Sequence, residues 1–400
     1  MIDARHTLGP VLGAAASLAF LLGSTAMAQT PTTMQGPAAA EGKVVSAPAG
    51  AAATKMPLAG PQQFRDAEQL APKSVPDGTP GFSGDMFRTR SEASSLEEPM
   101  AFGSSTAPYT TRRVAVQVLG NSTSALNTPV TSYPFRATGK LYFKIGTSTY
   151  VCSASLVKKG VLVTAAHCVH EFGKSASGWH TNFVFCPANT TSSGGVYGCY
   201  NAGWPRILTA YYNGSDTCTQ SGVVCNNDVA TLLVPPVSGV YAGSRVGWYG
   251  YGWNGYSYRA SSFLGNVTTV QISQLGYPAA FDSGYQMQRT DAVGWYYASG
   301  YLKNTQIGSA QTGGSSGGPW LVNLGTWPSI DTTRASHGSA PNMAVVGVTS
   351  YGSTTVGYNR QGSSFFGQNK EAPNSAYGTY GAGNIGMLMQ ATCTASPANC

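Results

Sequence analysis

The sequence predicts an all-β protein made of short strands joined by tight turns. Charged residues are only 10% of the 400 residues, well below the roughly 25% of an average soluble protein. The 50 glycines, together with abundant Tyr, Thr, Ser and Asn, suit strands and turns. Short apolar segments between turn residues recur at residues 139–145, 151–157, 161–165, 229–234 and 345–349. This pattern indicates β-structure, and only residues 383–391 favour a helix.

The first 28 residues have the pattern of a secretory signal peptide. Arg5 lies before an Ala/Leu-rich core at residues 14–22, and Ala-Met-Ala at residues 26–28 provides a small-x-small cleavage pattern. The apolar core is too short to cross a bilayer as a helix of the mature chain. We therefore expect a protein secreted to the periplasm or the extracellular space, without membrane anchorage.

Residues 29–113 differ in composition from the rest of the chain. They are rich in Ala, Pro, Gly and Ser and contain no cysteine, which favours a pro-region or a disordered leader. Arg112 and Arg113 end this segment and would suit a processing protease that leaves Val114 as the new N-terminus. A basic pair in an ordinary linker is the alternative. On the first interpretation the chain is a zymogen whose folded domain spans residues 114–400.

The net charge of +7 is carried by residues 114–400, which hold 14 Lys and Arg against seven Asp and Glu. These charges are spread along the segment instead of forming a basic cluster, so nucleic-acid binding has no support. We expect a monomer.

Eight cysteines, an even number, all lie beyond residue 150. An even count in an exported chain favours disulfides. Pairing sequence neighbours predicts Cys152–Cys168, Cys186–Cys199, Cys218–Cys225 and Cys393–Cys400. A zinc site is the alternative, but the chain has no Cys-x-x-Cys motif and only five histidines. We expect no metal at these cysteines and no cofactor, and we leave a structural calcium ion as an alternative.

Two separate segments supply an imidazole and a carboxylate, the partners that a serine nucleophile needs. His167 ends an apolar segment and is followed at once by Cys168, whose pairing would hold the backbone beside the imidazole. Asp228 precedes another apolar segment, where a carboxylate is costly to bury without a donor such as an imidazole N–H. A cap at the end of a strand is the alternative for this aspartate.

A third segment supplies the hydroxyl. Ser316 lies in Gly-Gly-Ser-Ser-Gly-Gly-Pro at residues 313–319. Glycines on both sides permit backbone angles that other residues resist, so the loop can turn the N–H groups of Gly314 and Ser316 toward one point. An oxyanion could lie there, although such a run by itself is more often a flexible loop.

Together these blocks resemble those of the chymotrypsin-like (trypsin-like) serine proteases. Thr-Ala-Ala-His-Cys at residues 164–168, Asn-Asn-Asp at 226–228 and Gly-Ser-Ser-Gly-Gly-Pro at 314–319 match the family's three blocks in order and spacing. Between the blocks, the resemblance runs only loosely from about residue 133 to 390.

The resemblance implies two antiparallel six-stranded β-barrels with the active site in the cleft between them. The barrels would span about residues 114–240 and 241–385, followed by a short helix and tail at 383–400. It implies polypeptide substrates and a catalytic triad of His167, Asp228 and Ser316, with Gly314 and Ser316 forming the oxyanion hole. It places substrate binding at Ala310, Gln311, Thr349, Ser350, Tyr351 and Gly352.

Three positions depart from the family's pattern. Ser315 replaces the aspartate that pairs with the new N-terminus in the trypsin branch, which is similar to secreted bacterial relatives such as the glutamyl and lysyl endopeptidases. Ala310 stands where trypsin-like enzymes have an acidic pocket base, and Thr349 stands where the glutamyl branch has a histidine. We therefore expect a neutral pocket for small or apolar side chains.

The sequence thus predicts a secreted serine endopeptidase of the glutamyl-endopeptidase-like branch. A catalytically silent binding or scaffold protein with the same fold is the alternative. A carbohydrate-binding protein built on the Tyr-rich residues 248–258 would leave the three blocks unexplained.

Overall fold

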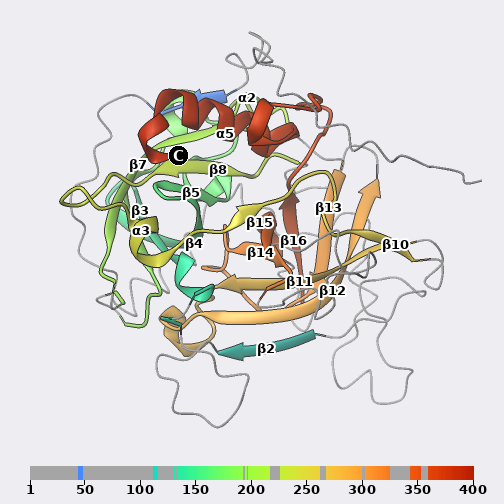
Figure 1. Ribbon diagram of the computed structural model, residues 1–400, viewed down its shortest axis with the longest axis horizontal. Coiled ribbons are helices and arrows are strands. Elements are labelled where there is room, and N and C mark those ends of the chain that lie inside the picture. Colours follow the sequence, from blue (N-terminus) through green and yellow to red (C-terminus); the bar gives the residue numbers. More distant parts are fainter. Residues whose placement is uncertain are drawn as a thin grey trace, which may run out of the picture. The chain divides into compact units, whose positions relative to one another are not determined.

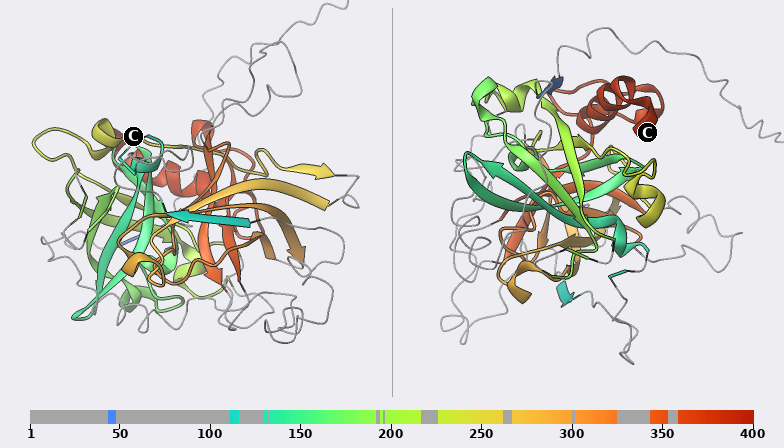
Figure 2. Two further views of the ribbon diagram at one scale, coloured as in Figure 1. Left: turned by 90° about the horizontal axis from the view of Figure 1, so that it is seen from below. Right: turned by 90° about the vertical axis from the view of Figure 1, so that its left-hand side faces the viewer.

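The computed structural model describes residues 44–47, 111–115, 130–131, 133–191, 194–195, 197–216, 226–261, 267–299, 302–324, 343–352 and 359–400. Most of these residues form two antiparallel β-barrels, seen in Figure 2 as the green and the orange-red strands. The prediction of an all-β fold with two six-stranded barrels is confirmed.

The first barrel has the strand order β7-β6-β3-β4-β5-β8, and a pairing between β7 and β8 closes the ring. Its strands are β3 (Thr138–Ile145), β4 (Ser148–Lys158), β5 (Val161–Thr164), β6 (Thr181–Pro187), β7 (Tyr200–Leu208) and β8 (Ala230–Leu233). Two short helices, α2 (Thr209–Tyr212) and α3 (Ala242–Val246), follow β7 and β8 in the chain.

The second barrel has the order β11-β14-β15-β16-β13-β12 and is closed by pairing of β11 with β12. Its strands are β11 (Val267–Gly276), β12 (Gln288–Ser299), β13 (Leu302–Gly308), β14 (Pro319–Val322), β15 (Ala344–Gly352) and β16 (Arg360–Phe365). The short strands β9 (Gly250–Tyr251) and β10 (Arg259–Ser261) pair with β15 and β11. Short 3-10 helices occupy Phe135–Ala137, Ala166–Cys168, Ser175–Gly178, Asp282–Gly284, Gly378–Tyr380 and Pro397–Asn399.

The two strands that lead to His167 and Asp228 are buried on both faces. β5 reads Val-Leu-Val-Thr and β8 reads Ala-Thr-Leu-Leu, and every one of these residues is buried. Strands covered on both faces read as apolar runs instead of alternating patterns. Because they pair antiparallel, Thr164 at the end of β5 lies opposite Ala230 at the start of β8. His167 follows one of these ends and Asp228 precedes the other, so both emerge at the same edge.

The C-terminal helix α5 (Gly383–Ala395) follows the second barrel in the chain but lies against the first (Figure 1). It extends four residues beyond the predicted helix at residues 383–391. Thr392 Oγ1 and Thr231 Oγ1 share a hydrogen bond of 2.7 Å. Asn384 Nδ2 donates to the carbonyls of Asn226 and Phe365, both at 2.9 Å. The helix thereby links the turn before Asp228 to the end of β16.

One apolar core continues through both barrels. It includes Leu162 and Leu232 of the first barrel, Leu321 and Val348 of the second, and Leu388 of α5. A smaller core fills the second barrel and includes Val270, Ile272, Trp320, Val346 and Phe365. Because the barrels share packed side chains, the residues between them are held by both.

Two short strands belong to the predicted leader. β1 (Val44–Ser46) pairs with β7, and β2 (Thr111–Ala115) pairs with β12. Ala47 N also donates to Pro205 O at 3.1 Å. These stretches are therefore part of the sheets, and β2, which contains Arg112 and Arg113, joins the second barrel and not the first. The signal peptide and most of residues 29–113 lie outside the described residues.

Three of the predicted cysteine pairs are disulfides in the structure: Cys152–Cys168, Cys186–Cys199 and Cys393–Cys400. Cys218 and Cys225 lie outside the described residues.

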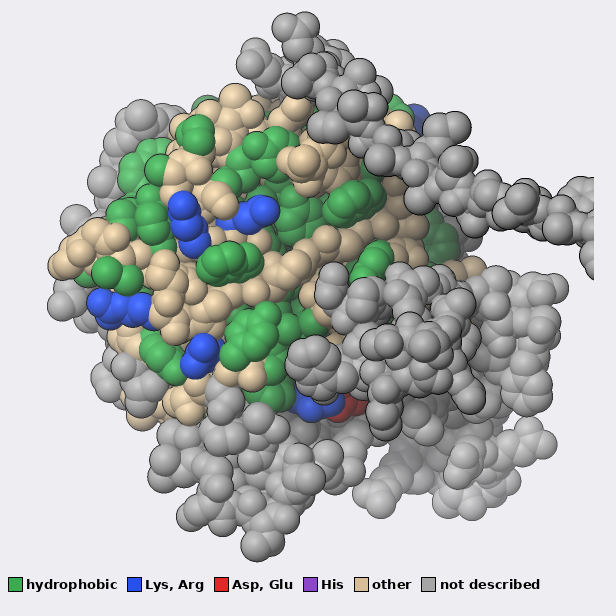
Figure 3. Space-filling model, viewed as in Figure 1, with side chains coloured by type: hydrophobic (Ala, Val, Ile, Leu, Met, Phe, Trp, Pro, Cys, Tyr) green, Lys and Arg blue, Asp and Glu red, His purple; other side chains and the backbone are tan. Residues whose placement is uncertain are grey.

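Lys and Arg side chains are scattered among apolar and uncharged residues on the face shown in Figure 3. Within the part of the chain that the structure describes, no helix has the length and apolar character needed to span a membrane. In the Tyr-rich segment at residues 248–258, Tyr249 and Tyr258 are buried, whereas Trp248 and Trp253 are exposed.

Candidate active site

His167 and Asp228 form a buried hydrogen-bonded pair. His167 lies in the 3-10 helix directly after β5 and is 2% exposed, while Asp228 is fully buried. Asp228 Oδ1 accepts the backbone N–H of His167 at 2.9 Å, and Oδ2 lies 2.7 Å from His167 Nδ1. Ser350 Oγ donates to the same Oδ2 at 2.6 Å. Three donors thus satisfy a carboxylate that would otherwise be costly to bury.

This arrangement selects one tautomer of His167. An ionised carboxylate only accepts hydrogen bonds, so Nδ1 carries the proton and Nε2 presents a lone pair. Nε2 is buried and has no hydrogen-bond partner among the described residues. The imidazole is therefore set to accept a proton on the side that faces away from Asp228.

The loop that carries Ser316 lies directly against the segment before His167. The carbonyl of Ser316 accepts Ser153 N at 2.7 Å, and the carbonyl of Gly314 accepts Ser153 Oγ at 2.8 Å. Gly317 has a φ of +75°, and a Cβ there would lie 2.0 Å from Thr164 Oγ1 and 2.8 Å from Ala165 N. Only glycine permits this close approach. The structure therefore brings Ser316 next to the strand end that carries His167, but no hydrogen bond joins Ser316 Oγ to His167 Nε2.

The N–H groups of Gly314 and Ser316 point away from the carbonyls of the residues before them. Gly313 O accepts Ala279 N at 2.9 Å, and Ser315 O accepts Gly318 N at 2.9 Å. In a planar trans peptide the N–H points away from the C=O. The N–H groups of Gly314 and Ser316 belong to these two peptides and have no hydrogen-bond partner among the described residues. They are the donors expected for an oxyanion hole.

Ser315 is buried and closes a turn within the same loop. Its hydroxyl donates to Thr312 O at 2.6 Å, and its backbone N–H donates to the same carbonyl at 3.1 Å. The loop is therefore held by a neutral side chain where the trypsin branch uses an acid.

The end of β15 leaves one edge open beside this loop. β14 pairs with β15 only up to Val348, whereas β16 pairs with it as far as Gly352. Residues 350–352 therefore extend beyond the part of β15 that pairs with β14, while they still pair with β16. An extended peptide can add to such an edge, and Ser350 places this edge next to Asp228.

The remaining predicted substrate-binding residues lie at the end of the second barrel. Ala310 is half-buried, while Gln311, Thr349 and Tyr351 are buried. Sequence reasoning missed two buried glutamines. Gln274 Nε2 donates to Thr349 Oγ1, and Gln361 Nε2 donates to the carbonyl of Gln311. No local motif marks these two glutamines.

Sequence reasoning also missed Asp216, which supports the turn before Asp228. Asp216 is fully buried, and its Oδ2 accepts the backbone N–H groups of Asn226 at 3.1 Å and Asn227 at 2.7 Å. Its Oδ1 is buried and has no hydrogen-bond partner in the part of the chain that the structure describes. Burial and, to a lesser degree, the charge of Glu371 raise the pKa of Asp216 to about 7, while the two N–H donors act in the opposite direction.

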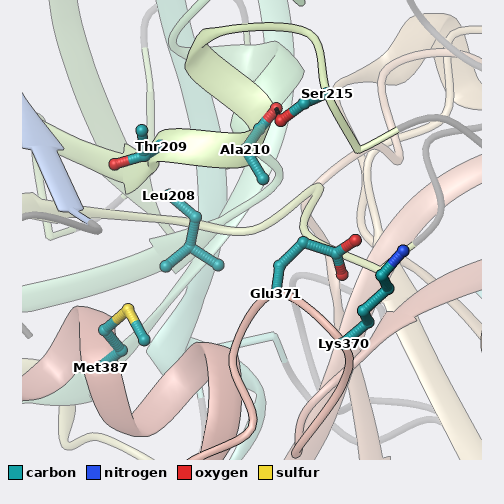
Figure 4. A pocket seen from close by; sticks show the side chains of 7 residues that line it. All are labelled: Leu208, Thr209, Ala210, Ser215, Lys370, Glu371 and Met387. Atoms are coloured by element: carbon teal, nitrogen blue, oxygen red, sulfur yellow. Dashed lines mark hydrogen bonds between the residues drawn. The ribbon is translucent and has the colours of Figure 1, made fainter.

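A cavity of about 330 Å³ lies beside Asp216, and its lining does not include His167, Asp228 or Ser316 (Figure 4). It is lined by Leu208, Thr209, Ala210, Ser215, Lys370, Glu371 and Met387. In Figure 4 the charged ends of Lys370 and Glu371 lie on one side, and the apolar Leu208 and Met387 on the other. The cavity borders the residue before Asp216 and contains no predicted catalytic residue.

We expect Asp216→Asn to stabilise the protein at pH 8 and to have little effect at pH 4. The pKa of Asp216 in the folded state, about 7, lies above the ordinary value of 3.8. The contribution of protonated Asp216 to the free energy of unfolding is therefore fully present below about pH 4. It is lost as the pH rises through about 7. A shift of about three pKa units corresponds to about 4 kcal/mol. Asparagine keeps an oxygen for the two N–H groups and carries no charge.

Thermal unfolding of both proteins at pH 4, 6 and 8 measures this effect. The difference in Tm should grow from near zero to about 5 °C in favour of the variant. Asp282→Asn makes the same charge change at an exposed position and is the control variant. A Tm difference for Asp216→Asn that is constant with pH would contradict the assignment.

Comparison with known proteins bears on this geometry. Residues 126–185, which contain His167 and the strands before it, match the family model described as Trypsin. The chain is similar to the trypsin family over this segment. The matched segment supplies β3, β4 and β5 of the first barrel.

The chain is also similar to three individual proteins. An extracellular metalloprotease of Bacillus subtilis (strain 168) is 29% identical over 136 residues, which is 34% of this chain and 38% of that protein. This chain therefore spans little more than a third of that relative. The thermostable serine protease AL20 from an extremophilic microorganism is 24% identical, with a TM-score of 0.43, over 58% of this chain and 92% of its own. A Glu endopeptidase solved with MPD is 15% identical, with a TM-score of 0.42, over 71% of this chain and 96% of its own.

Proposed function

We propose that this chain is a secreted serine endopeptidase that acts through Ser316, His167 and Asp228. The observation that supports this most is the hydrogen-bonded line from Ser350 through Asp228 to His167. The Ser316 loop packs against the strand end that carries His167. His167 Nε2, whose lone pair has no hydrogen-bond partner among the residues described, is the base that such a reaction needs.

In the proposed reaction, Ser316 Oγ attacks the scissile carbonyl while His167 Nε2 takes its proton. Asp228 holds the imidazole in the required tautomer and stabilises the imidazolium. The N–H groups of Gly314 and Ser316 bind the oxyanion. His167 then gives the proton to the leaving amine, and water hydrolyses the acyl-enzyme in a second round of the same steps. The substrate backbone adds to residues 350–352 on the edge opposite β16.

Secretion and maturation are part of the proposal. The signal pattern at residues 1–28, the three disulfides and the similarity to an extracellular protease support export. Cleavage after Arg113 stays a prediction. That bond lies inside β2, so β2 must leave β12 before a processing protease can bind it in extended form. Ser315 carries no charge to pair with a new N-terminal ammonium, in agreement with the branch that includes the glutamyl endopeptidases.

Labelling with a fluorophosphonate probe tests the proposal. We expect the native processed protein to form one covalent adduct, which peptide mass spectrometry maps to Ser316. The heat-unfolded protein should not react, because an isolated serine hydroxyl is a weak nucleophile. Absence of an adduct, at a probe concentration that saturates a known serine protease, would favour a catalytically silent protein with this fold.

A further inference from the structure

The side chain of the substrate residue before the scissile bond, P1, must enter a defined region if the proposed function holds. Its carbonyl carbon lies at Ser316, and its backbone pairs with residues 350–352. Residues 309–311 lead into the Ser316 loop, and the Gln361 side chain connects them to residues 350–352 because it contacts both segments. We call the region between residues 309–311 and 350–352 the P1 site.

Gln361 extends across the P1 site. It lies opposite Gly352 in the pairing of β16 with β15. A Cβ at Gly352 would lie 3.3 Å from Gln361 Cγ and 3.6 Å from Gln361 Nε2, so the amide passes directly under this glycine. Gln361 Nε2 then donates to the carbonyl of Gln311. The side chain thus spans from the substrate-binding strand to the opposite wall.

Both ends of the Gln361 amide are held. Its Oε1 accepts Gln274 Nε2, and Gln274 Nε2 also donates to Thr349 Oγ1 at 2.9 Å. Ser309 Oγ in turn donates to Gln274 Oε1 at 2.7 Å. All of these side chains are 5% exposed or less. A buried network in which each member has partners is costly to open, so Gln361 cannot easily rotate away from an incoming side chain.

The network contains no charge. Its members are amides and hydroxyls, and Ala310 adds only a methyl group. Arg360 precedes Gln361 on β16, and successive side chains of a strand point to opposite faces. A P1 Lys, Arg or Glu would therefore lose its hydration without gaining an opposite charge, which is strongly unfavourable.

We propose that Gln361 is the specificity-determining residue of this chain and limits P1 to small uncharged side chains such as Ala and Ser. The inference rests on the proposed function and goes beyond it by naming the substrate class. The amide closes the P1 site across its width, so a large side chain such as Leu or Phe overlaps Gln361. Substrate and Gln361 then compete for the same volume, and replacing Gln361 by a smaller residue admits larger side chains.

A peptide library that varies only P1 tests this on the processed enzyme. We expect the wild type to show its highest kcat/KM for Ala and Ser. In Gln361→Ala the ratio of kcat/KM for Leu to that for Ala should rise at least tenfold, because each methylene that fits is worth about 10-fold or more. Gln361→Asn keeps the amide and removes one methylene, and we expect an intermediate ratio. It also serves if the alanine variant does not fold.

Gln288→Ala is the matched control. Gln288 is also a fully buried glutamine of the second barrel, but its Nε2 donates to Asp282 at 2.6 Å, and Asp282 belongs to neither segment that defines the P1 site. It should lower stability without changing the Leu-to-Ala ratio.

Fluorophosphonate labelling of every variant separates the possible failures. A wild type that is not labelled, or is labelled but cleaves no peptide, contradicts the proposed function. A labelled wild type that prefers Arg, Lys, Glu or large apolar residues at P1 contradicts the role of Gln361 alone. Labelled Gln361 variants whose P1 profile equals that of the wild type also contradict the role of Gln361.

Discussion

Ser316→Ala should lower kcat for peptide hydrolysis by about 10⁶-fold, because it removes the group that forms the acyl-enzyme. Ser315 is no substitute, since it is buried and its hydroxyl donates to Thr312 O at 2.6 Å. The variant should keep the wild-type Tm, because Ser153 and Gly318 bond to main-chain carbonyls of the loop and not to the Ser316 hydroxyl. Steady-state kinetics with a short peptide that carries Ala at P1 measures the loss.

Ser315→Ala is the neighbouring control. It deletes one hydrogen bond of the turn, worth about 1 kcal/mol, and leaves the proposed nucleophile in place. We expect less than a tenfold loss of kcat. If Ser315→Ala abolishes hydrolysis while Ser316→Ala remains active, the nucleophile has been assigned to the wrong serine.

The sequence predicted the site best where a chemically active residue lies directly beside the end of a strand. The apolar segments at residues 161–165 and 229–234 correspond to β5 and β8. Their antiparallel pairing is sufficient to bring His167 and Asp228 together, because one follows β5 and the other precedes β8. The glycines around Ser316 indicated a loop with unusual backbone angles, and Gly314 and Gly317 have φ of +92° and +75°. In these cases the relevant information is local.

Residues whose role depends on register could not be found in this way. Gln361 lies 87 residues from Gln274 and 50 from Gln311, and their contacts depend on how β11 and β16 are aligned in the barrel. A glutamine that becomes buried in a strand has no local sequence pattern that distinguishes it from one at the surface. Asp216 is a similar case, because its role depends on a contact with Asn226, which lies ten residues further along the chain.

The leader shows a different limit. β1 has only three residues, which is too short for a period of two to be recognised. Its composition favoured disorder, whereas its backbone pairs with β7 at Arg206–Leu208. This segment is a strand because its backbone pairs with β7, which lies far away in the sequence.

Asp228→Asn should lower kcat by about 10⁴-fold near neutral pH while leaving the fold intact. Asp228 accepts from His167 N, His167 Nδ1 and Ser350 Oγ. An asparagine has only one oxygen, and it is best placed to keep the bond to His167 N. Its NH₂ group then faces Nδ1 and selects the tautomer in which Nε2 carries the proton. That imidazole cannot take a proton from Ser316.

Ser350→Ala separates this tautomer effect from a general loosening of the site. It removes the hydrogen bond to Asp228 Oδ2 but leaves the carboxylate and the Nδ1 proton in place. Loss of one hydrogen bond to a charged group is worth about 1.5–3 kcal/mol, so we expect kcat to fall by about 10- to 100-fold. Nitrogen NMR of His167 should report the Nδ1–H tautomer in Ser350→Ala and the Nε2–H tautomer in Asp228→Asn. Equal losses of kcat in the two variants, with one common tautomer, would mean that Asp228 acts only by packing and not by orienting the base.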